Sequence, residues 1–467
     1  MTDAQLIKQI NGDFRHILQK MDTPDNPAKN ILAQANRDFH ERGCVINVGK
    51  GDDIVKKPFP VFVMPYFVTR NEMNEIGRVS NIIMNVLEKV SNLYFLDNKF
   101  KPMFNLTDKE TELVECETGT QRLVWITRND AFQEGDILKF IEFNTDSPGG
   151  PMYSDVQTEI IEQSVVMDEL RKKYYMSSDR FVPQILYNLL RAYREWGGKK
   201  QLPNIAIVSD KGATYPEFLL IVEDFKRQGY KCEFATPPEI EYHNGKAFTP
   251  GGMEIDIFYR RGWIRNWTDV WDDIKPLRKA YKENAFCCVN SIRSLLAAIK
   301  SLLEHLQDEE IAKLYTPEER EIVFKHIPWT RLMKDRKTLG FDGKTSVELF
   351  DYVRNNREKL VLKPMDLYGG QGVCVGPVST QAEWEKTIEI AATTEQKYVV
   401  QHYVQIPEME LPEVDPELVW KPKKLNQNFY AFGGAHAGGM CRTSEAAVIN
   451  ISAGGGLCPI VVVEGIR

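Results

Sequence analysis

The sequence predicts a mixed α/β protein in which α+β lobes surround a ligand site. Segments with strand alternation and segments with helical spacing follow one another over most of the chain after Arg122. A length of 467 residues exceeds what one hydrophobic core usually serves, so two or three closely packed domains are expected. Two glycine-bounded stretches, residues 140–150 and 360–376, place charged and amide side chains where strands end.

Charge and composition narrow the class of protein. The 59 Lys and Arg residues and 66 Asp and Glu residues give a net charge of −7. With no basic block, this argues against nucleic acid or an anionic membrane as the main partner. Residues 1–20 are polar and amphipathic, and no apolar run is long enough to span a bilayer. The eight cysteines include no C-x-x-C pair, which indicates neither a zinc site nor a disulfide framework. We therefore expect a soluble, cytoplasmic protein.

Residues 1–200 are expected to hold an N-terminal helical region followed by two strands and further helices. Apolar residues recur there first at helical spacing and then, from Arg122, in strand-like runs. The expected elements are helices over 81–90, 155–167 and 183–196, and strands over 123–126 and 137–144.

Residues 201–292 are expected to form a separate Rossmann-like domain. A buried strand over 205–208, an amphipathic helix over 216–228 and a strand over 231–234 give a βαβ unit. A further strand over 255–261 ends in Arg260 and Arg261, where open α/β sheets bind ligands. Arginine forks suit carboxylate or phosphate. The alternative is that one arginine pairs with Asp256 or with a helix end.

Residues 293–467 are expected to alternate again between helices and strands. Lys300 falls inside the apolar pattern of one predicted helix, and a lysine on the buried side of a helix needs a partner. The expected elements are helices over 290–306, 346–360 and 379–391, strands over 398–404 and 448–452, and a strand on either side of the glycine turn in 360–376.

The stretch 140–150 predicts a metal site. Residues two apart on a strand point to the same face, so Glu142 and Asn144 can both offer oxygens to one hard cation such as Mg²⁺. The alternative is a strand end and Pro-Gly turn with a solvated Glu142.

The stretch 360–376 predicts a phosphate site. An apolar strand reaches Lys363, and a glycine turn then lets backbone N–H groups approach phosphate oxygens. It is not a Walker loop, because the lysine precedes the glycines. The alternative is an ordinary glycine-rich hairpin with an edge lysine. Near the end of the chain, Arg442 and Asn450 have the donors that suit an anionic transition state.

Together these motifs resemble those of a circularly permuted ATP-grasp ligase, as in eukaryotic-type glutathione synthetase and the glutathionylspermidine synthetase-like carboxylate–amine ligases. The resemblance covers roughly residues 120–467. In non-permuted relatives the Glu-x-Asn-Thr-x-Pro-Gly loop lies near the end of the chain, whereas here residues 142–149 precede Lys363. The resemblance therefore implies a permuted ATP-grasp fold, with an inserted Rossmann-like substrate domain at 201–292 and nucleotide-binding lobes at 293–467.

The same resemblance implies roles for individual residues. It implies catalysis by Arg442 and Arg128, and binding of ATP, substrate and Mg²⁺ by three further groups. These groups are Lys300, Lys363, Gly369, Gly370, Gln371, Gln401 and Val404 for ATP; Arg128, Ser147, Tyr259, Arg261 and Asn450 for substrate; and Glu142, Asn144 and Asp366 for Mg²⁺. Asp366 stands where the family commonly has a glutamate. Ser444 stands near a second basic residue of glutathione synthetase, which weakens an assignment to glutathione itself.

The implied activity is ATP-dependent ligation of a carboxylate to an amine through an acyl phosphate. The expected substrates are small amino acids or peptides of the γ-glutamyl type, and a homo-oligomer is compatible with the sequence. Two alternatives stay open: a nucleotide-binding regulatory relative without ligase activity, and a phosphotransferase acting on a small carboxylate. Both share the nucleotide site with the ligase.

Overall fold

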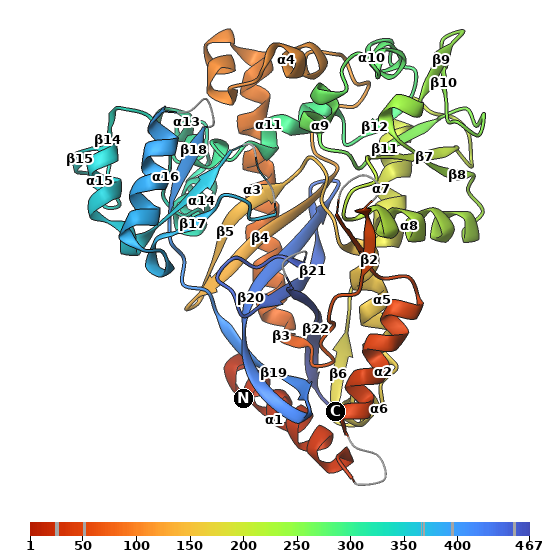
Figure 1. The fold of residues 1–467 in the computed structure, drawn as a ribbon, viewed down its shortest axis with the longest axis vertical. Coiled ribbons are helices and arrows are strands. Elements are labelled where there is room, and N and C mark those ends of the chain that lie inside the picture. Colours follow the sequence, from red (N-terminus) through yellow and green to blue (C-terminus); the bar gives the residue numbers. More distant parts are fainter. Residues whose placement is uncertain (24–27, 50–52, 366, 368, 394–396, 452–453) are drawn as a thin grey trace.

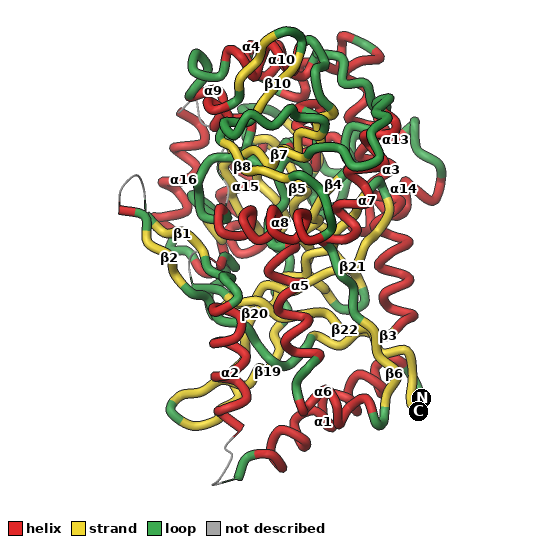
Figure 2. Tube along the Cα trace, turned by 90° about the vertical axis from the view of Figure 1, so that its right-hand side faces the viewer, coloured by secondary structure: helices red, strands yellow, loops and turns green. Residues whose placement is uncertain are grey.

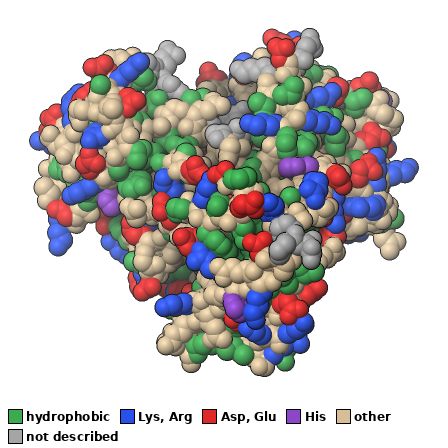
Figure 3. Space-filling view, turned by 60° about the horizontal axis from the view of Figure 1, so that its bottom comes forward, with side chains coloured by type: hydrophobic (Ala, Val, Ile, Leu, Met, Phe, Trp, Pro, Cys, Tyr) green, Lys and Arg blue, Asp and Glu red, His purple; other side chains and the backbone are tan. Residues whose placement is uncertain are grey.

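The computed structural model describes residues 1–23, 28–49, 53–365, 367, 369–393, 397–451 and 454–467. These residues form a central body built on a large sheet, with one lobe on each side of its upper half (Figure 1). A notch separates the two lobes on the molecular surface (Figure 3). No helix in the described part of the chain is long and apolar enough to cross a membrane.

The central sheet is mostly antiparallel and joins strands from distant parts of the chain. Its strand order is β3-β22-β21-β20-β4-β5, with β19 paired to β20 and β6 paired to β22. Only β22 and β3 pair in parallel among these described strands. The strands are β3 (Tyr66–Thr69), β4 (Ile126–Glu134), β5 (Ile137–Asn144), β6 (Tyr174–Ser177), β19 (Glu408–Asp415), β20 (Glu417–Phe432), β21 (Ala435–Ser444) and β22 (Gly456–Ile466).

Helices cover both faces of this sheet (Figure 2). The long helix α3 (Arg70–Leu96) begins at a capping box between Thr69 and Glu72 and buries apolar residues against the sheet. This agrees with the helix expected around 81–90. The other covering helices are α1 (Asp3–Met21), α2 (Ala28–Glu41), α5 (Pro151–Glu162), α6 (Val165–Arg171) and α14 (Pro317–His326). Short strands β1 (Ile46–Val48) and β2 (Val55–Lys57) pair beside them.

The lobe on the right of Figure 1 contains a parallel sheet in the order β12-β11-β7-β8. The βαβ unit expected from residues 205–234 is present there, and Arg261 directly follows β11. The elements are α7 (Val182–Glu195), β7 (Ile205–Val208), α8 (Tyr215–Arg227), β8 (Cys232–Ala235), β11 (Ile257–Arg260), α10 (Lys275–Lys282) and β12 (Cys287–Val289).

The lobe on the left, which we call the lid lobe, spans residues 330–403 and contains an antiparallel sheet in the order β13-β18-β16-β17. It has a small hydrophobic core of its own around Trp384, Val353 and Leu362. The elements are β13 (Thr330–Leu332), β14 (Lys337–Leu339), β15 (Ser346–Glu348), α15 (Leu349–Asn355), β16 (Leu360–Pro364), β17 (Cys374–Val375), α16 (Gln381–Thr393) and β18 (Tyr398–His402).

The prediction of one continuous helix over 290–306 is wrong. The segment holds the short helices α11 (Leu295–Ala298) and α12 (Leu302–His305), separated by extended backbone at Ile299. The apolar spacing is real, because Leu295, Leu296, Ile299, Leu302 and Leu303 are all buried. A pattern of apolar side chains does not report a break in the backbone, and the break turns Lys300 away from the apolar face.

Other predicted elements differ from the structure as well. The strand expected over 123–126 begins only at Ile126, as β4, and the helix expected over 155–167 is divided between α5, which ends at Glu162, and α6, which begins at Val165. The helix expected over 346–360 begins as strand β15, which pairs with β14, and becomes helical only at Leu349. The strand expected over 448–452 is an irregular loop up to residue 451, and Ser452 lies outside the described residues. Its Asn450 side chain donates to the Gly369 carbonyl at 2.6 Å, so this segment contacts another loop in place of joining a sheet.

Candidate active site

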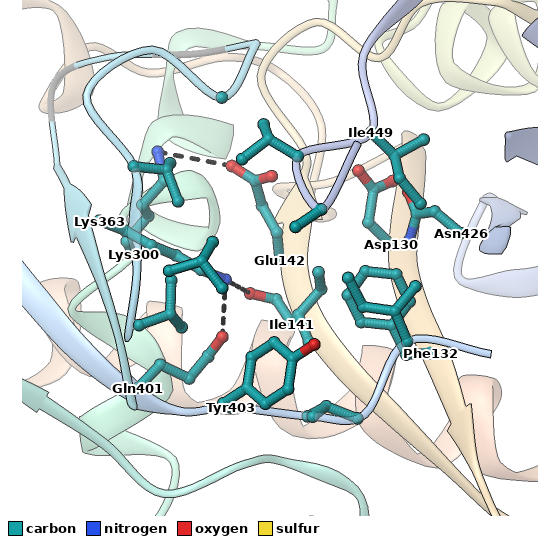
Figure 4. A pocket seen from close by; sticks show the side chains of 18 of the residues that line it. Asp130, Phe132, Ile141, Glu142, Lys300, Lys363, Gln401, Tyr403, Asn426 and Ile449 are labelled. Atoms are coloured by element: carbon teal, nitrogen blue, oxygen red, sulfur yellow. Dashed lines mark hydrogen bonds and ion pairs between the residues drawn. The ribbon is translucent and has the colours of Figure 1, made fainter. Parts of the chain in front are cut away.

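A cavity of about 160 Å³ lies between the central sheet and the sheet of the lid lobe (Figure 4). We call it the inner cavity. Its floor comes from β4 and β5, and its other wall comes from β16 and β18. The predicted site residues that line it are Arg128, Glu142, Asn144, Lys300, Lys363, Gly369, Gly370, Gln401, Val404 and Arg442.

Two arginines hold one buried carboxylate on the central sheet. Arg128 Nε donates to Asp130 Oδ1 at 2.8 Å, and Arg442 Nη2 donates to Asp130 Oδ2 at 2.5 Å. Burial alone would raise the pKa of Asp130, but Arg128 and Arg442 hold that pKa below its usual value. The carboxylate therefore fixes both guanidinium groups at the edge of the inner cavity.

Two asparagines complete the support of Arg442. Asn428 Oδ1 accepts from Arg442 Nε at 3.0 Å, and Asn426 Oδ1 accepts from Nη2 at 2.6 Å. Sequence reasoning did not identify these residues, nor the bridging role of Asp130. The available signal was a run of consecutive amides, Asn426-Gln427-Asn428, in a strand where each is buried.

Glu142 and Asn144 lie at the end of β5, opposite Asp130 and Arg128 on β4. The buried Nδ2 of Asn144 has no hydrogen-bond partner among the described residues, and Asn144 lines the inner cavity beside Glu142. A carboxylate and an amide oxygen, with further positions left for phosphate and water, suit Mg²⁺. The residues present therefore fit the predicted ion.

The third predicted metal ligand, Asp366, lies outside the described residues. Where the structure describes the chain, no group of three His, Cys, Asp or Glu side chains is placed to hold a metal.

Lys300 reaches the inner cavity from the break between α11 and α12. Its Nζ lies 3.4 Å from Glu142 Oε1 and donates to the Leu367 carbonyl at 2.9 Å. The sequence analysis expected a partner for this buried-side lysine. Lys300 has two: a carboxylate on β5 and a carbonyl of the glycine-rich segment. Lys300 connects the central sheet to the lid lobe.

Lys363 projects from β16 toward the central sheet (Figure 4). Its Nζ donates to Gln401 Oε1 at 2.6 Å and to the Ile141 carbonyl at 3.4 Å. Gln401 in turn donates to Thr330 Oγ1 at 3.0 Å, which fixes the orientation of its amide. Burial lowers the pKa of Lys363 to about 8. A bound anion beside Lys363 would stabilise its charged, ammonium form.

The inner cavity has charged and apolar lining residues. Besides the arginines, the lysines, Asp130 and Glu142, the lining includes an apolar set: Phe132, Ile141, Val361, Val375, Val404 and Ile406.

Two loops meet above the inner cavity. Besides the contact of Asn450 with Gly369, a Cβ atom added to Gly370 would lie 2.2 Å from Val448 Cγ1. Only glycine allows this approach. The cavity of about 160 Å³ is smaller than the roughly 300–1,000 Å³ typical of small-molecule sites, so a nucleotide needs these loops to separate.

The remaining predicted substrate residues lie outside the inner cavity. The Ser147 hydroxyl donates to the Arg261 carbonyl, and Arg261 Nη1 donates to the Tyr259 hydroxyl at 3.0 Å. Arg261 Nη2 lies 3.6 Å from Glu217 Oε2, and burial raises the pKa of Glu217. Sequence reasoning missed Glu217, because a single acid on an amphipathic helix gives no signal of its own.

This buried cluster adjoins the arginine pair through the turn after β5. Glu217 accepts from the backbone N–H of Gly150, and Arg128 Nη1 donates to the Gly149 carbonyl at 2.9 Å. Gln371, expected at the nucleotide, is exposed and does not line the inner cavity.

Comparison with solved structures confirms the predicted fold class. The chain is similar to a glutathione synthetase-like effector of Globodera pallida in its apo form, with a TM-score of 0.57 and 12% sequence identity. The match covers 92% of this chain and 96% of that one. The chain thus has a mixed α/β, glutathione synthetase-like fold. The circular permutation and the insertion of the Rossmann-like domain stay predictions.

The relatives found by sequence comparison are uncharacterized, so they assign no function to this chain. Uncharacterized proteins of Mycobacterium tuberculosis and Mycobacterium bovis are each 22% identical to this chain over 494 aligned residues, which cover 98% of it and 82% of theirs. No protein-family model matches the chain.

Proposed function

We propose that this protein is an ATP-dependent carboxylate–amine ligase that forms an amide bond, of the peptide or γ-glutamyl type, through an acyl phosphate. The charge of the inner cavity carries the proposal. Within the described lining, cations outnumber carboxylates, and a partly buried excess of positive charge favours a polyanionic ligand. The cations are Arg128, Lys300, Lys363 and Arg442, and the carboxylates are Asp130 and Glu142.

The nucleotide would lie along the length of the inner cavity. Its base would lie against the apolar lining residues beside Val404, and its phosphates would contact Lys300 and Lys363. Glu142 and Asn144 would hold Mg²⁺, which supplies neutralisation of the phosphate oxygens when bound. The glutathione synthetase-like fold supports this arrangement.

The arginine pair would serve the transferred phosphoryl group and the acyl group. A substrate carboxylate oxygen attacks the γ-phosphorus, the bond to the β–γ bridging oxygen breaks, and ADP leaves. An amine then adds to the acyl carbon, and inorganic phosphate leaves with formation of the amide. The guanidinium groups of Arg128 and Arg442 would stabilise the negative charge in both steps. No protein nucleophile is required.

The carboxylate substrate would approach from the Arg261 cluster, because that cluster adjoins Arg128 and contains the predicted contacts Ser147 and Tyr259. We therefore propose a small amino acid or peptide as that substrate.

Glu142→Gln tests the metal assignment. The substitution removes one negative charge but keeps the shape of the side chain, so it should raise the Mg²⁺ concentration needed for ATP turnover while the melting temperature hardly changes. A matched control is Glu75→Gln, which alters an exposed ion pair with Arg78. A Mg²⁺ titration of Glu142→Gln that overlays the wild type would remove the metal site from this proposal.

A screen of ATP consumption with pairs of amino acids separates ligation from phosphotransfer. The ligase should consume ATP with one pair and give a condensed product detectable by mass. ADP release with a phosphorylated carboxylate and no condensed product would favour the phosphotransferase, and nucleotide binding without turnover would favour a regulatory relative.

A further inference from the structure

Lys363 is held on the lid side of the inner cavity by a chain of hydrogen bonds that crosses three adjacent strands. In the order β13, β18 and β16, these strands carry Thr330, Gln401 and Lys363. Thr330 lies directly opposite Gln401 in the register, so their side chains share one face of the sheet. Gln401 and Lys363 line the inner cavity, whereas Thr330 is fully buried and is not part of its described lining.

The polarity of this chain is fixed at its far end. The Pro328 carbonyl can only accept, and the Thr330 hydroxyl donates to it at 2.9 Å. A threonine hydroxyl has a single proton, so Thr330 Oγ1 can only accept from the Gln401 amide, whose Nε2 donates at 3.0 Å. The amide oxygen of Gln401 must then face Lys363, whose Nζ donates to it at 2.6 Å (Figure 4).

Gln401 supplies the principal acceptor for Lys363. In the part of the chain that the structure describes, its Oε1 is the one side-chain oxygen that accepts from Lys363, and the Ile141 carbonyl is more distant, at 3.4 Å. An ammonium group has three donors. A ligand oxygen can therefore replace the Ile141 carbonyl, or take the remaining donor, while Gln401 keeps its hydrogen bond to Lys363.

The charged groups that face Lys363 belong to the central body. Glu142 on β5 and Asp130 on β4 raise the pKa of Lys363, whereas Lys300 lowers it. The arginine pair lines the same cavity and is bound to Asp130.

The lid lobe faces Lys363 with uncharged groups. His402 and Tyr403 follow Gln401 and also line the inner cavity. Burial lowers the pKa of His402 and raises that of Tyr403, so both are uncharged near pH 7. Among the described lid residues that line the cavity, none is a carboxylate. The neutral oxygen of Gln401 is therefore what orients the ammonium from this side.

We propose that Thr330 is a positioning residue for Lys363 and acts through Gln401. It directs the amide oxygen of Gln401 to Lys363 and so fixes the ammonium where it would meet a phosphate oxygen. Gln401 would then serve ATP through Lys363 and not by contact with the base. The effect on nucleotide affinity rests on the proposed function, whereas the effect on Lys363 itself does not.

Titration with a non-hydrolysable ATP analogue tests the role of Thr330. Thr330→Val keeps the shape but removes the acceptor that holds the Gln401 amide, so affinity should fall about three- to tenfold, as for one lost hydrogen bond. Thr330→Ser keeps the hydroxyl and should bind as the wild type does. The matched control is Thr338→Val, which removes a lid-lobe hydroxyl that accepts from Arg331 and should leave affinity unchanged. Wild-type affinity in Thr330→Val, or equal losses in the valine and serine variants, would overturn the proposal.

A double-mutant cycle tests whether Thr330 acts through Lys363. In the background of Lys363→Ala, which itself binds weakly, Thr330→Val should cause no further loss of affinity. A second loss as large as the first would mean that Thr330 acts by another route, and the proposal would then be wrong.

A companion variant separates positioning from misfolding. Thr330→Val leaves the buried Gln401 Nε2 without its acceptor, whereas Thr330→Val combined with Gln401→Met replaces both partners by apolar groups and should melt at a higher temperature than Thr330→Val. The double variant should nevertheless bind the analogue as weakly as Gln401→Met. Wild-type affinity in the double variant would contradict a positioning role.

A measurement without nucleotide separates this inference from the proposed function. The rate at which acetic anhydride acetylates Lys363, followed by mass spectrometry across pH, reports the pKa of Lys363. Loss of the amide oxygen removes a partner of the charged form, so this pKa should fall by about one pH unit in Gln401→Met and fall also in Thr330→Val. Unchanged profiles in both variants would exclude the positioning role. A lowered pKa in variants of a protein that binds no ATP analogue would retain that role and remove the proposed function.

Discussion

The arginines and the lysines of the inner cavity are held in different ways. Arg128 and Arg442 project from adjacent parts of the central sheet and share the buried carboxylate of Asp130 at 2.5 to 2.8 Å. Lys300 and Lys363 are held mainly by carbonyl and amide oxygens, and Lys300 lies 3.4 Å from its nearest carboxylate partner. The arginines are therefore preorganised, whereas the lysines are placed to exchange their present partners for a ligand.

The hydrophobic cores show the same division. The central sheet and the parallel-sheet lobe share one continuous core, which also takes in Leu332, Met365 and Val399 of the lid lobe, while the rest of the lid lobe packs around a small core of its own. Lys363 lies on β16 beside Leu362 of that small core, whereas the arginine pair is held on the central sheet.

Removing the shared carboxylate should have the largest effect. Asp130→Asn removes the buried carboxylate that both guanidinium groups contact, so the free energy of unfolding should fall by about 3–5 kcal/mol in a denaturant titration. The matched change in the lid lobe is Asp351→Asn, which alters an exposed ion pair with Arg354 and should hardly move stability. Equal effects of the two substitutions would contradict the contrast between the two regions.

Arg442→Lys should lower turnover by about 10²–10³ while ATP binding is kept. An ammonium cannot reproduce the fork that contacts Asp130, Asn426 and Asn428. In the proposed mechanism this arginine would act mainly on charge that develops during reaction. The rate comes from ADP release and the affinity from titration with an ATP analogue. Wild-type turnover in this variant would assign Arg442 to structure alone.

Affinity for the ATP analogue should fall as pH rises above about 8, by up to tenfold for each pH unit. Phosphate binding needs the ammonium form of Lys363, and burial lowers its pKa to about 8 in the free protein, so binding must supply the free energy of protonation above that pH. Lys363→Arg stays charged and should show a flat profile over the same range, whereas Lys363→Ala should bind weakly at every pH. A wild-type profile that stays flat would show that Lys363 does not contact phosphate.

Local motifs predicted which nearby residues come together at the inner cavity. Strand alternation singled out Glu142 and Asn144, and the glycine turn singled out Lys363 and Gly370; all four line the inner cavity, and their roles stay predictions. The role of Asp130 could not be predicted in this way, because it depends on the pairing of Asn428 on β20 with β4. Short-range patterns do not encode such register.

The helical regions show the same limit. Part of helix α3 was predicted because apolar residues keep helical spacing over 81–90, whereas the break at Ile299 leaves the apolar spacing of 290–306 unchanged and places Lys300 against Leu367 and Glu142. Strand β3 was missed because four residues carry too little periodicity to distinguish a strand.

The pairing of β20 and β21 with β4 also sets when the site can exist during synthesis. Asp130 and Arg442 are 312 residues apart in the chain, which a ribosome adds in roughly 15–60 s. During that interval β4 lacks its partner β20, while the parallel-sheet lobe is completed by Val289. A nascent chain of this protein therefore has its parallel-sheet lobe long before Asp130 has both of its arginine partners.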